Sequence, residues 1–160
     1  MLKLLSVIVF SVLFVGNGEK YTEIRKVVDV VNEAAPAKTW DGQYLKSVSL
    51  IEKENVVVFY IKNVGGRIPR KENMDKEVMV KNAAFFVANF MTAYDYSIEG
   101  VGGEGDENLF KKVGSLLKLL ARNDVGVRFN LEFRKGGTFS LGLAPSELEK
   151  AVLLRKNDFH

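Results

Sequence analysis

The clearest pattern in the chain is a strict alternation of apolar and polar side chains over Val125 to Phe133. A period of two predicts a β-strand with one buried face and one solvated face. A turn at Lys135–Thr138 follows, and Phe139 to Leu143 then resumes the alternation. The two runs therefore predict a hairpin, with the strand at Val125–Phe133 lying beside Phe139–Leu143.

Two earlier apolar runs predict a second hairpin. Tyr44–Glu52 and Asn55–Lys62 are rich in Val, Ile, Leu and aromatic residues, and a polar stretch at Lys53–Asn55 separates them. These are features of two strands joined by a turn. The second run is apolar at both its odd and its even positions, which predicts a strand in the centre of a sheet.

Apolar residues at helical spacing predict an amphipathic helix at Glu19–Ala35, which Pro36 ends because the residue before a proline disfavours helical geometry. A second helix is predicted to begin at a cap, Asn73 or Asp75, and to run to about Tyr94. Its middle is apolar around much of its circumference, which indicates an element buried on more than one side.

A third helix is predicted from its cap, Asp106, to Ala121, and we expect Asn123 to end it in a left-handed conformation. A short last helix follows Pro145, with Ser146 and Glu149 in the spacing of a capping box. The segment between the second and third helices, Gly100–Gly105, holds four glycines in six residues and is expected to be a mobile loop.

Taken in order, these elements predict an α+β fold: a four-stranded, mostly antiparallel sheet made of two hairpins and covered by three to four helices. The helices at Asp75–Tyr94 and Asp106–Ala121 are expected to pack on one face. The order helix, hairpin, helix occurs twice, which is consistent with a degenerate duplication or with the needs of any sheet covered by helices.

The first eighteen residues have the features of a secretory signal. Lys3 gives a positive start, Leu4–Val15 is an apolar run broken only by two serines, and Gly16-Asn17-Gly18 offers small residues for cleavage after Gly18. A membrane-spanning helix needs about 20 apolar residues, so this run predicts a cleaved signal and no stable anchor. We expect residues 1–18 to be removed and residues 19–160 to form one domain in a periplasmic or secreted protein.

Charge and cysteine content exclude several classes of function. Of the 23 Lys and Arg residues only Lys3 lies in the signal, so the mature chain has 22 basic and 20 acidic residues, interspersed along its length. A nucleic-acid-binding protein usually concentrates basic residues on one face, so we do not expect nucleic-acid binding. The chain has no cysteine, which excludes disulfides, zinc–thiolate sites and cysteine nucleophiles.

The sequence contains few candidate catalytic residues. The one histidine, His160, is the last residue and is poorly placed for acid–base catalysis. No phosphate-binding glycine motif occurs in the required frame, and we predict no cofactor, no metal site and no catalytic residue. The alternative is a carboxylate-dependent hydrolase acting on a glycan-like substrate. Its candidate acids surround the glycine-rich segment: Glu99, Glu104, Asp106 and Glu107.

The favoured function is the binding of another protein, by an exported, non-enzymatic chain such as an inhibitor, an immunity factor or a secretion accessory. The predicted strand at Val125–Phe133 carries a polar row that is either the ordinary solvated face of a sheet or a platform for a partner, on which arginines are favoured anchors. A basic loop is a second candidate surface. The candidate binding residues are Arg128, Asn130, Glu132 and Arg134 in the row, and Arg67 and Arg70 in the loop.

Two stretches give the chain a resemblance to a loosely defined group of small exported bacterial proteins of unknown function. They are Val31-Asn32-Glu33-Ala34-Ala35-Pro36 followed by the strand pair through Val57-Phe59-Tyr60, and Leu119-Leu120-Ala121 leading to Val125-Gly126-Val127-Arg128-Phe129. Members of the group tend to carry a cysteine pair beside the C-terminal hairpin, which this sequence lacks. The resemblance implies export and an α+β fold, and it implies no site residues.

Overall fold

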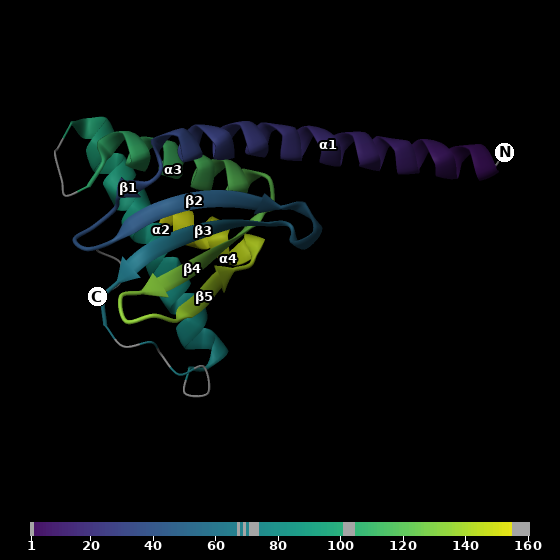
Figure 1. The fold of residues 1–160 in the computed structure, drawn as a ribbon. Helices are drawn as coiled ribbons and strands as arrows, with labels where there is room; N and C mark the ends of the chain where they lie inside the picture. The colour runs from purple at the N-terminus through teal and green to yellow at the C-terminus, as the bar shows by residue number, and fades with distance from the viewer. Residues whose placement is uncertain (1, 67, 69, 71–73, 101–104, 155–160) are drawn as a thin grey trace.

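A computed structural model describes residues 2–66, 68, 70, 74–100 and 105–154, and for residues 2–17 it describes the backbone alone (Figure 1). The structure is α+β, as predicted, and the expected mobile loop falls largely outside the described residues. The elements in chain order are α1 (Leu2–Ala34), β1 (Ala37–Lys38), β2 (Tyr44–Ile51), the 3-10 turn η1 (Glu52–Glu54), β3 (Val56–Val64), α2 (Lys76–Glu99), α3 (Glu107–Arg122), β4 (Gly126–Phe133), β5 (Thr138–Leu143) and α4 (Pro145–Leu153).

The sheet has five strands in the order β1-β2-β3-β4-β5, so the prediction of four strands was wrong by one. The missed strand, β1, has only two residues, too few to show a hydrophobic pattern. Both predicted hairpins are confirmed, and three of the four pairings are antiparallel. The central pairing of β3 with β4 is parallel, because α2 and α3 return the chain to the end at which β3 begins.

The central position predicted for the strand that is apolar on both faces is confirmed by β3. Register places Phe59 of β3 beside Val48 of β2 and Phe129 of β4. All three side chains are buried, and so is Val58, which points to the opposite face of the sheet. β3 is therefore shielded on both faces, as its composition indicated.

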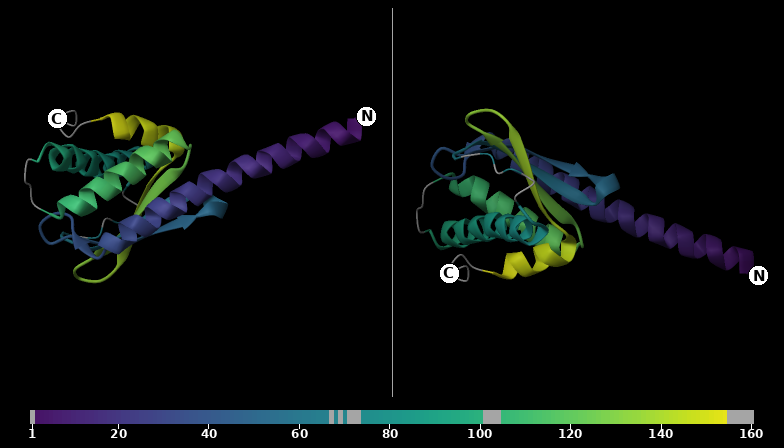
Figure 2. Two further views of the ribbon diagram at one scale, coloured as in Figure 1. Left: turned by 90° about the horizontal axis from the view of Figure 1, so that it is seen from above. Right: turned by 90° about the horizontal axis from the view of Figure 1, so that it is seen from below.

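The helices lie on one side of the sheet, and in the described part of the chain no helix covers the other side (Figure 2). Aromatic side chains fill the space between the two layers. The ring centroids of Phe59 and Phe129 are 5.3 Å apart, and Phe86 of α2 stacks on Phe129 at 5.4 Å. Trp40 closes one end of this core, with its ring centroid 4.8 Å from that of Phe90. Trp40 is thus partly buried as a core residue.

Helix α1 is longer than predicted, because it begins at Leu2 and runs without a break past Glu19 to Ala34. Its first half extends away from the rest of the protein (Figure 1). The second half packs on the domain through Ile24 and Val31, which are fully buried. Among the described residues, no helix combines the length and apolar character needed to cross a membrane.

The caps of α2 and α3 are confirmed, whereas the predicted ends of both helices need correction. Asp75 accepts a hydrogen bond from the Val78 N–H at 2.8 Å, and α2 continues beyond Tyr94 to Glu99. Asn123 does cap α3, but with a φ of −100°. The left-handed residue is Asp124, with a φ of 53°, because the chain turns one residue later to enter β4.

The capping box predicted at Ser146 and Glu149 was wrong by two residues. Helix α4 begins at Pro145, so its N-cap is Ala144, whose N–H donates to Glu147 Oε2 at 2.8 Å. Pro145 itself occupies the first helical position, where a missing N–H costs nothing and φ is already helical. Ser146 and Glu149 therefore lie inside the helix.

Close contact between α2 and α3 depends on a glycine. A Cβ atom on Gly114 of α3 would lie 2.2 Å from the ring of Tyr94 on α2. The same ring carries the Lys118 Nζ above it, 4.1 Å from the ring centroid. Tyr94 is therefore held between the two helices, in contact with the bare backbone at Gly114.

Replacing Gly114 by Ala tests this contact, because the sign of the change in the free energy of unfolding shows whether the added methyl group fits. In an exposed helix the change from Gly to Ala stabilises by about 1 kcal/mol, whereas overpacking a core costs about 1–3 kcal/mol. We expect Gly114→Ala to lower the free energy of unfolding in a denaturant titration, and Ser115→Ala, at an exposed neighbouring position, to change it little. A stabilised Gly114→Ala variant would contradict the packing described.

Candidate functional site

The face of the sheet opposite the helices is the candidate site. Strand register arranges its side chains in rows that cross β2, β3, β4 and β5. One row joins Ser49, Val58, Arg128 and Gly142, and the next joins Ser47, Tyr60, Asn130 and Ser140. We call this surface the polar face; its polar side chains are Ser47, Ser49, Tyr60, Lys62, Arg128, Asn130, Glu132, Thr138 and Ser140.

Bonds to neighbouring elements hold the polar row of β4 in place. Arg128 Nη2 lies 2.6 Å from Glu54 Oε2 in the turn between β2 and β3. The hydroxyl of Ser140 donates to Asn130 Oδ1 at 2.7 Å, across the β4–β5 pairing. These side chains are therefore tied to elements on both sides of β4.

Glu132, the third member of the row, is tied to the far hairpin. Its Oε2 lies 3.2 Å from Lys46 Nζ, which belongs to β2, two strands away. Both side chains stay substantially exposed, at 42% for Glu132 and 49% for Lys46. Exposed pairs of this kind add at most about 1 kcal/mol to stability, so the bond orients the two groups more than it stabilises the fold.

A shallow pocket of about 190 Å³ lies within the polar face. The groups it offers are hydroxyl, amide, ammonium and carboxylate, which form hydrogen bonds and ion pairs with a bound surface. The described residues include no histidine that could act as a base for these hydroxyls. In the described part of the chain, no group of three or more acidic, histidine or cysteine side chains is placed to hold a metal ion. The pocket is lined by Lys46, Tyr60, Ile61, Asn130, Glu132, Thr138 and Ser140.

The structure brings three of the six predicted binding residues together: Arg128, Asn130 and Glu132 share one face of β4. Arg134 follows the strand and is exposed in the turn to β5. Arg70 is exposed in the segment after β3, and Arg67 lies outside the described residues. The sequence analysis missed Lys46, Tyr60 and Ser140, since their place beside the row depends on which strands are neighbours.

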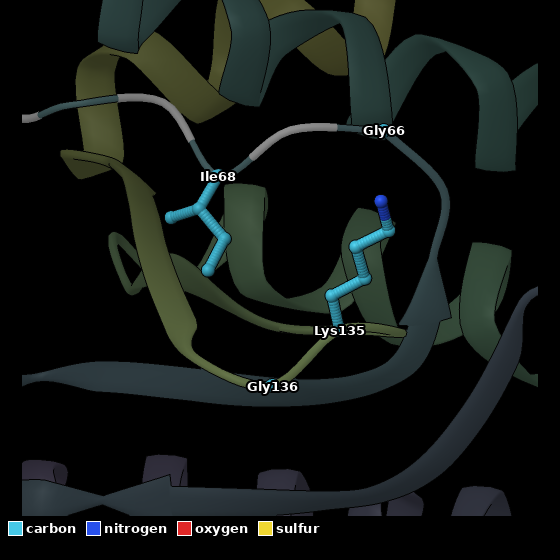
Figure 3. Close-up of a pocket in the computed structure, with 4 residues that line it drawn as sticks. All are labelled: Gly66, Ile68, Lys135 and Gly136. Atoms are coloured by element: carbon cyan, nitrogen blue, oxygen red, sulfur yellow. The ribbon is translucent and has the colours of Figure 1, made fainter.

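A second hollow, of about 500 Å³, lies between the segment after β3 and the β4–β5 turn (Figure 3). It is lined by Gly66, Ile68, Lys135 and Gly136, and the side chains of Ile68 and Lys135 enter it from opposite sides. Ile68 also packs against Gly137, where an added Cβ would lie 2.3 Å from Ile68 Cδ1. Ile68 therefore lies against the β4–β5 turn.

Three of the four carboxylates proposed for a hydrolase, Glu99, Asp106 and Glu107, belong to the described residues, and none of the three lines either pocket. Asp106 serves as the cap of α3, where its Oδ1 accepts from the Leu109 N–H at 2.9 Å. Glu99 and Glu107 are exposed at the facing ends of α2 and α3, and Glu104 lies outside the described residues. A helix cap and two solvated acids favour a structural role, so the geometry gives the hydrolase alternative no support.

No protein-family model matches the chain, and no curated protein or solved structure matches it either. Function is therefore inferred from the chain's own residues and their geometry.

Reversing two charges of the site tests how β4 faces. We expect the double variant Arg128→Glu/Arg134→Glu to lower the free energy of unfolding by no more than about 1 kcal/mol, because exposed ion pairs contribute little. The matched control is Phe129→Ala, one residue along the same strand on the buried face, which should cost about 3–5 kcal/mol. Thermal or denaturant unfolding measures both changes, and a double variant as unstable as the control would show that the row is buried.

Proposed function

We propose that this chain is an exported, non-enzymatic protein that binds another protein through the polar face. The observation that carries the proposal is a sheet whose described helices all lie on one side, and whose other side presents polar groups already held in position. Side chains held in this way lose less conformational freedom on binding than free ones, which favours association. Tyr60, at the centre of the face, and Arg128 are of the residue types enriched at protein interfaces.

Cations at the corner formed by the β4–β5 turn, and Arg70 in the segment after β3, add to the binding capacity of the face. Arg134, Lys135 and Arg70 have no ion-pair partner among the described residues. All three are exposed. A partner that offers carboxylates there would form new ion pairs without breaking existing ones, so we expect the partner to be acidic at this corner.

The start of the packed domain supports the export part of the proposal. Gly18 and Glu19 are exposed, and the first described contacts with other elements come from Lys20 and Tyr21. The Tyr21 hydroxyl donates to Asn55 Oδ1 at 3.0 Å. Cleavage after Gly18 would therefore leave these contacts intact, as the removal of a signal peptide requires.

Partner binding is tested by charge reversal with a matched control. A partner captured on the wild-type protein is purified, and its affinity is then measured for Arg128→Glu/Arg134→Glu and for Lys111→Glu/Lys150→Glu. The control changes the net charge equally on the helix side, at two exposed positions of α3 and α4. We expect the polar-face variant to bind at least about 30-fold more weakly, the loss typical of a buried interfacial arginine, and the control to bind nearly as wild type. Equal losses in both variants, or none in either, would contradict the proposal.

Export is tested by N-terminal analysis. Protein recovered from outside the cytoplasm should begin at or near Glu19, because Gly16 and Gly18 supply the small residues that signal peptidase needs. Protein that still begins at Met1, found in the soluble cytoplasm and not outside it, would contradict the prediction. A variant with Arg at Gly18 serves as control and should retain its first eighteen residues.

A further inference from the structure

Among the described residues, no strand pairs with the outer edge of β5. β5 is last in the sheet, and its neighbour β4 pairs with it antiparallel. In such a pair, alternate residues direct their backbone N–H and C=O groups towards the neighbouring strand. The Phe133 N–H donates to the Gly137 C=O at 3.1 Å, so Gly137 and every second residue after it direct their backbone groups towards β4. The groups of Phe139 and Leu141 therefore face β4, and those of Thr138, Ser140 and Gly142 face outward.

The opposite edge of the sheet is covered along part of its length. β1 pairs with the start of β2, at Tyr44 and Leu45. Further along β2, the side chain of Asn32 on α1 accepts from the Val48 N–H at 2.8 Å and donates to the Val48 C=O at 2.9 Å. Among the described residues, no comparable bond reaches the outward backbone groups of β5. The two edges therefore differ in whether a further strand can pair.

The composition of β5 also leaves its edge open. Natural sheets usually protect an edge strand with charged residues, a proline or a bulge. β5 reads Thr-Phe-Ser-Leu-Gly-Leu, which holds no charge and no proline, and its register with β4 is unbroken. We propose that an extended segment of the partner pairs antiparallel with β5 as a sixth strand, the mode known as β-augmentation. This inference rests on the proposed protein-binding function and adds the form of the partner.

Charge complementarity sets the composition expected of that segment. The C-terminal end of an antiparallel strand would lie beside the start of β5, next to the unpaired Arg134 and Lys135. Acidic residues at that end would form ion pairs there. Between its ends, side chains would alternate: those beside Phe139 and Leu141 would extend the buried side, and those beside Ser140 would extend the polar face. The partner segment is thus an alternating apolar and polar strand that ends in acidic residues.

A second copy of this chain fits the same edge less well. Helix α2 packs against β5, so a symmetric pairing of two β5 strands would bring two α2 helices to the two-fold axis. Helices need about 8–10 Å between their axes, whereas paired strands lie about 4.8 Å apart. A single extended strand brings no helix with it and avoids this conflict.

Amide exchange on the isotope-labelled full chain tests the edge directly. The probe is a short acetylated peptide of alternating threonine and valine that ends in two aspartates. In the free protein, the amides of Thr138, Ser140 and Gly142 should exchange rapidly and those of Phe139 and Leu141 slowly. With the peptide at saturation, the three outward amides should slow by at least about tenfold. A peptide ending in two lysines is the control and should bind more weakly, with the difference shrinking at high salt.

Ser140→Pro removes one outward N–H and should weaken peptide binding by about tenfold. Ser140→Ala loses the hydroxyl but keeps the N–H, and it should bind the peptide more tightly than Ser140→Pro. If Ser140→Pro does not fold, amide exchange of the wild-type protein with and without the peptide still shows whether a strand pairs with β5. Slow exchange at the three amides of the free protein, or no slowing with the peptide, would overturn the inference. Association of two copies through β5 would also overturn it.

The outcome separates this inference from the proposed function. Loss of partner binding in Arg128→Glu/Arg134→Glu, with full binding in Ser140→Pro, would sustain a protein-binding polar face and overturn strand addition. Full binding in both variants would overturn both proposals.

Discussion

The parallel pairing of β3 with β4 determines most of the remaining architecture. Its register sets Val57 beside Val127 and Phe59 beside Phe129, so the most apolar strands of the two hairpins meet in the middle of the sheet. Parallel neighbours cannot be joined by a tight turn, and the chain must cross over the sheet between them. Here the crossover consists of α2 and α3. Phe86 and Phe90 of α2 and the buried side chains of α3 pack in one core with the paired strands.

The polar face follows from the side on which that crossover lies. With the helices on one face, the other face must shield its apolar residues with side chains of the sheet itself. Val58 is fully buried on this face, and its register neighbour is Arg128. Arginine can cover apolar surface with its aliphatic stem while its charged end stays in water, and here Glu54 holds that end. The same residue thus serves both the core and the exposed surface.

Local patterns in the sequence predicted local structure well, because side-chain period and helix caps depend on near neighbours. Alternation at Val125–Phe133 identified β4 and its facing, and Asp75 and Asp106 were identified as caps. The parallel contact of β3 with β4 was not predictable in this way, because a pattern shows that a strand is central without naming its neighbours. The partners of the polar row, Lys46 and Glu54, depend on that contact and were missed for the same reason.

The two borders of the sheet differ in how far the described fold depends on them. At the β2 border, β1 pairs with Tyr44 and Leu45 and Asn32 bonds both backbone groups of Val48, and the bonds of Asn32 also fasten α1 to the sheet. At the β5 border, no described hydrogen bond reaches the outward backbone groups of Thr138, Ser140 and Gly142, so no described contact of the fold depends on them. The exposed ion pairs of the polar face are likewise worth at most about 1 kcal/mol each. Under the proposed function, a partner would exchange them for its own contacts at little cost to the fold. Selectivity would then come from the fixed geometry of the row and from Arg134 and Lys135, which have no ion-pair partner among the described residues.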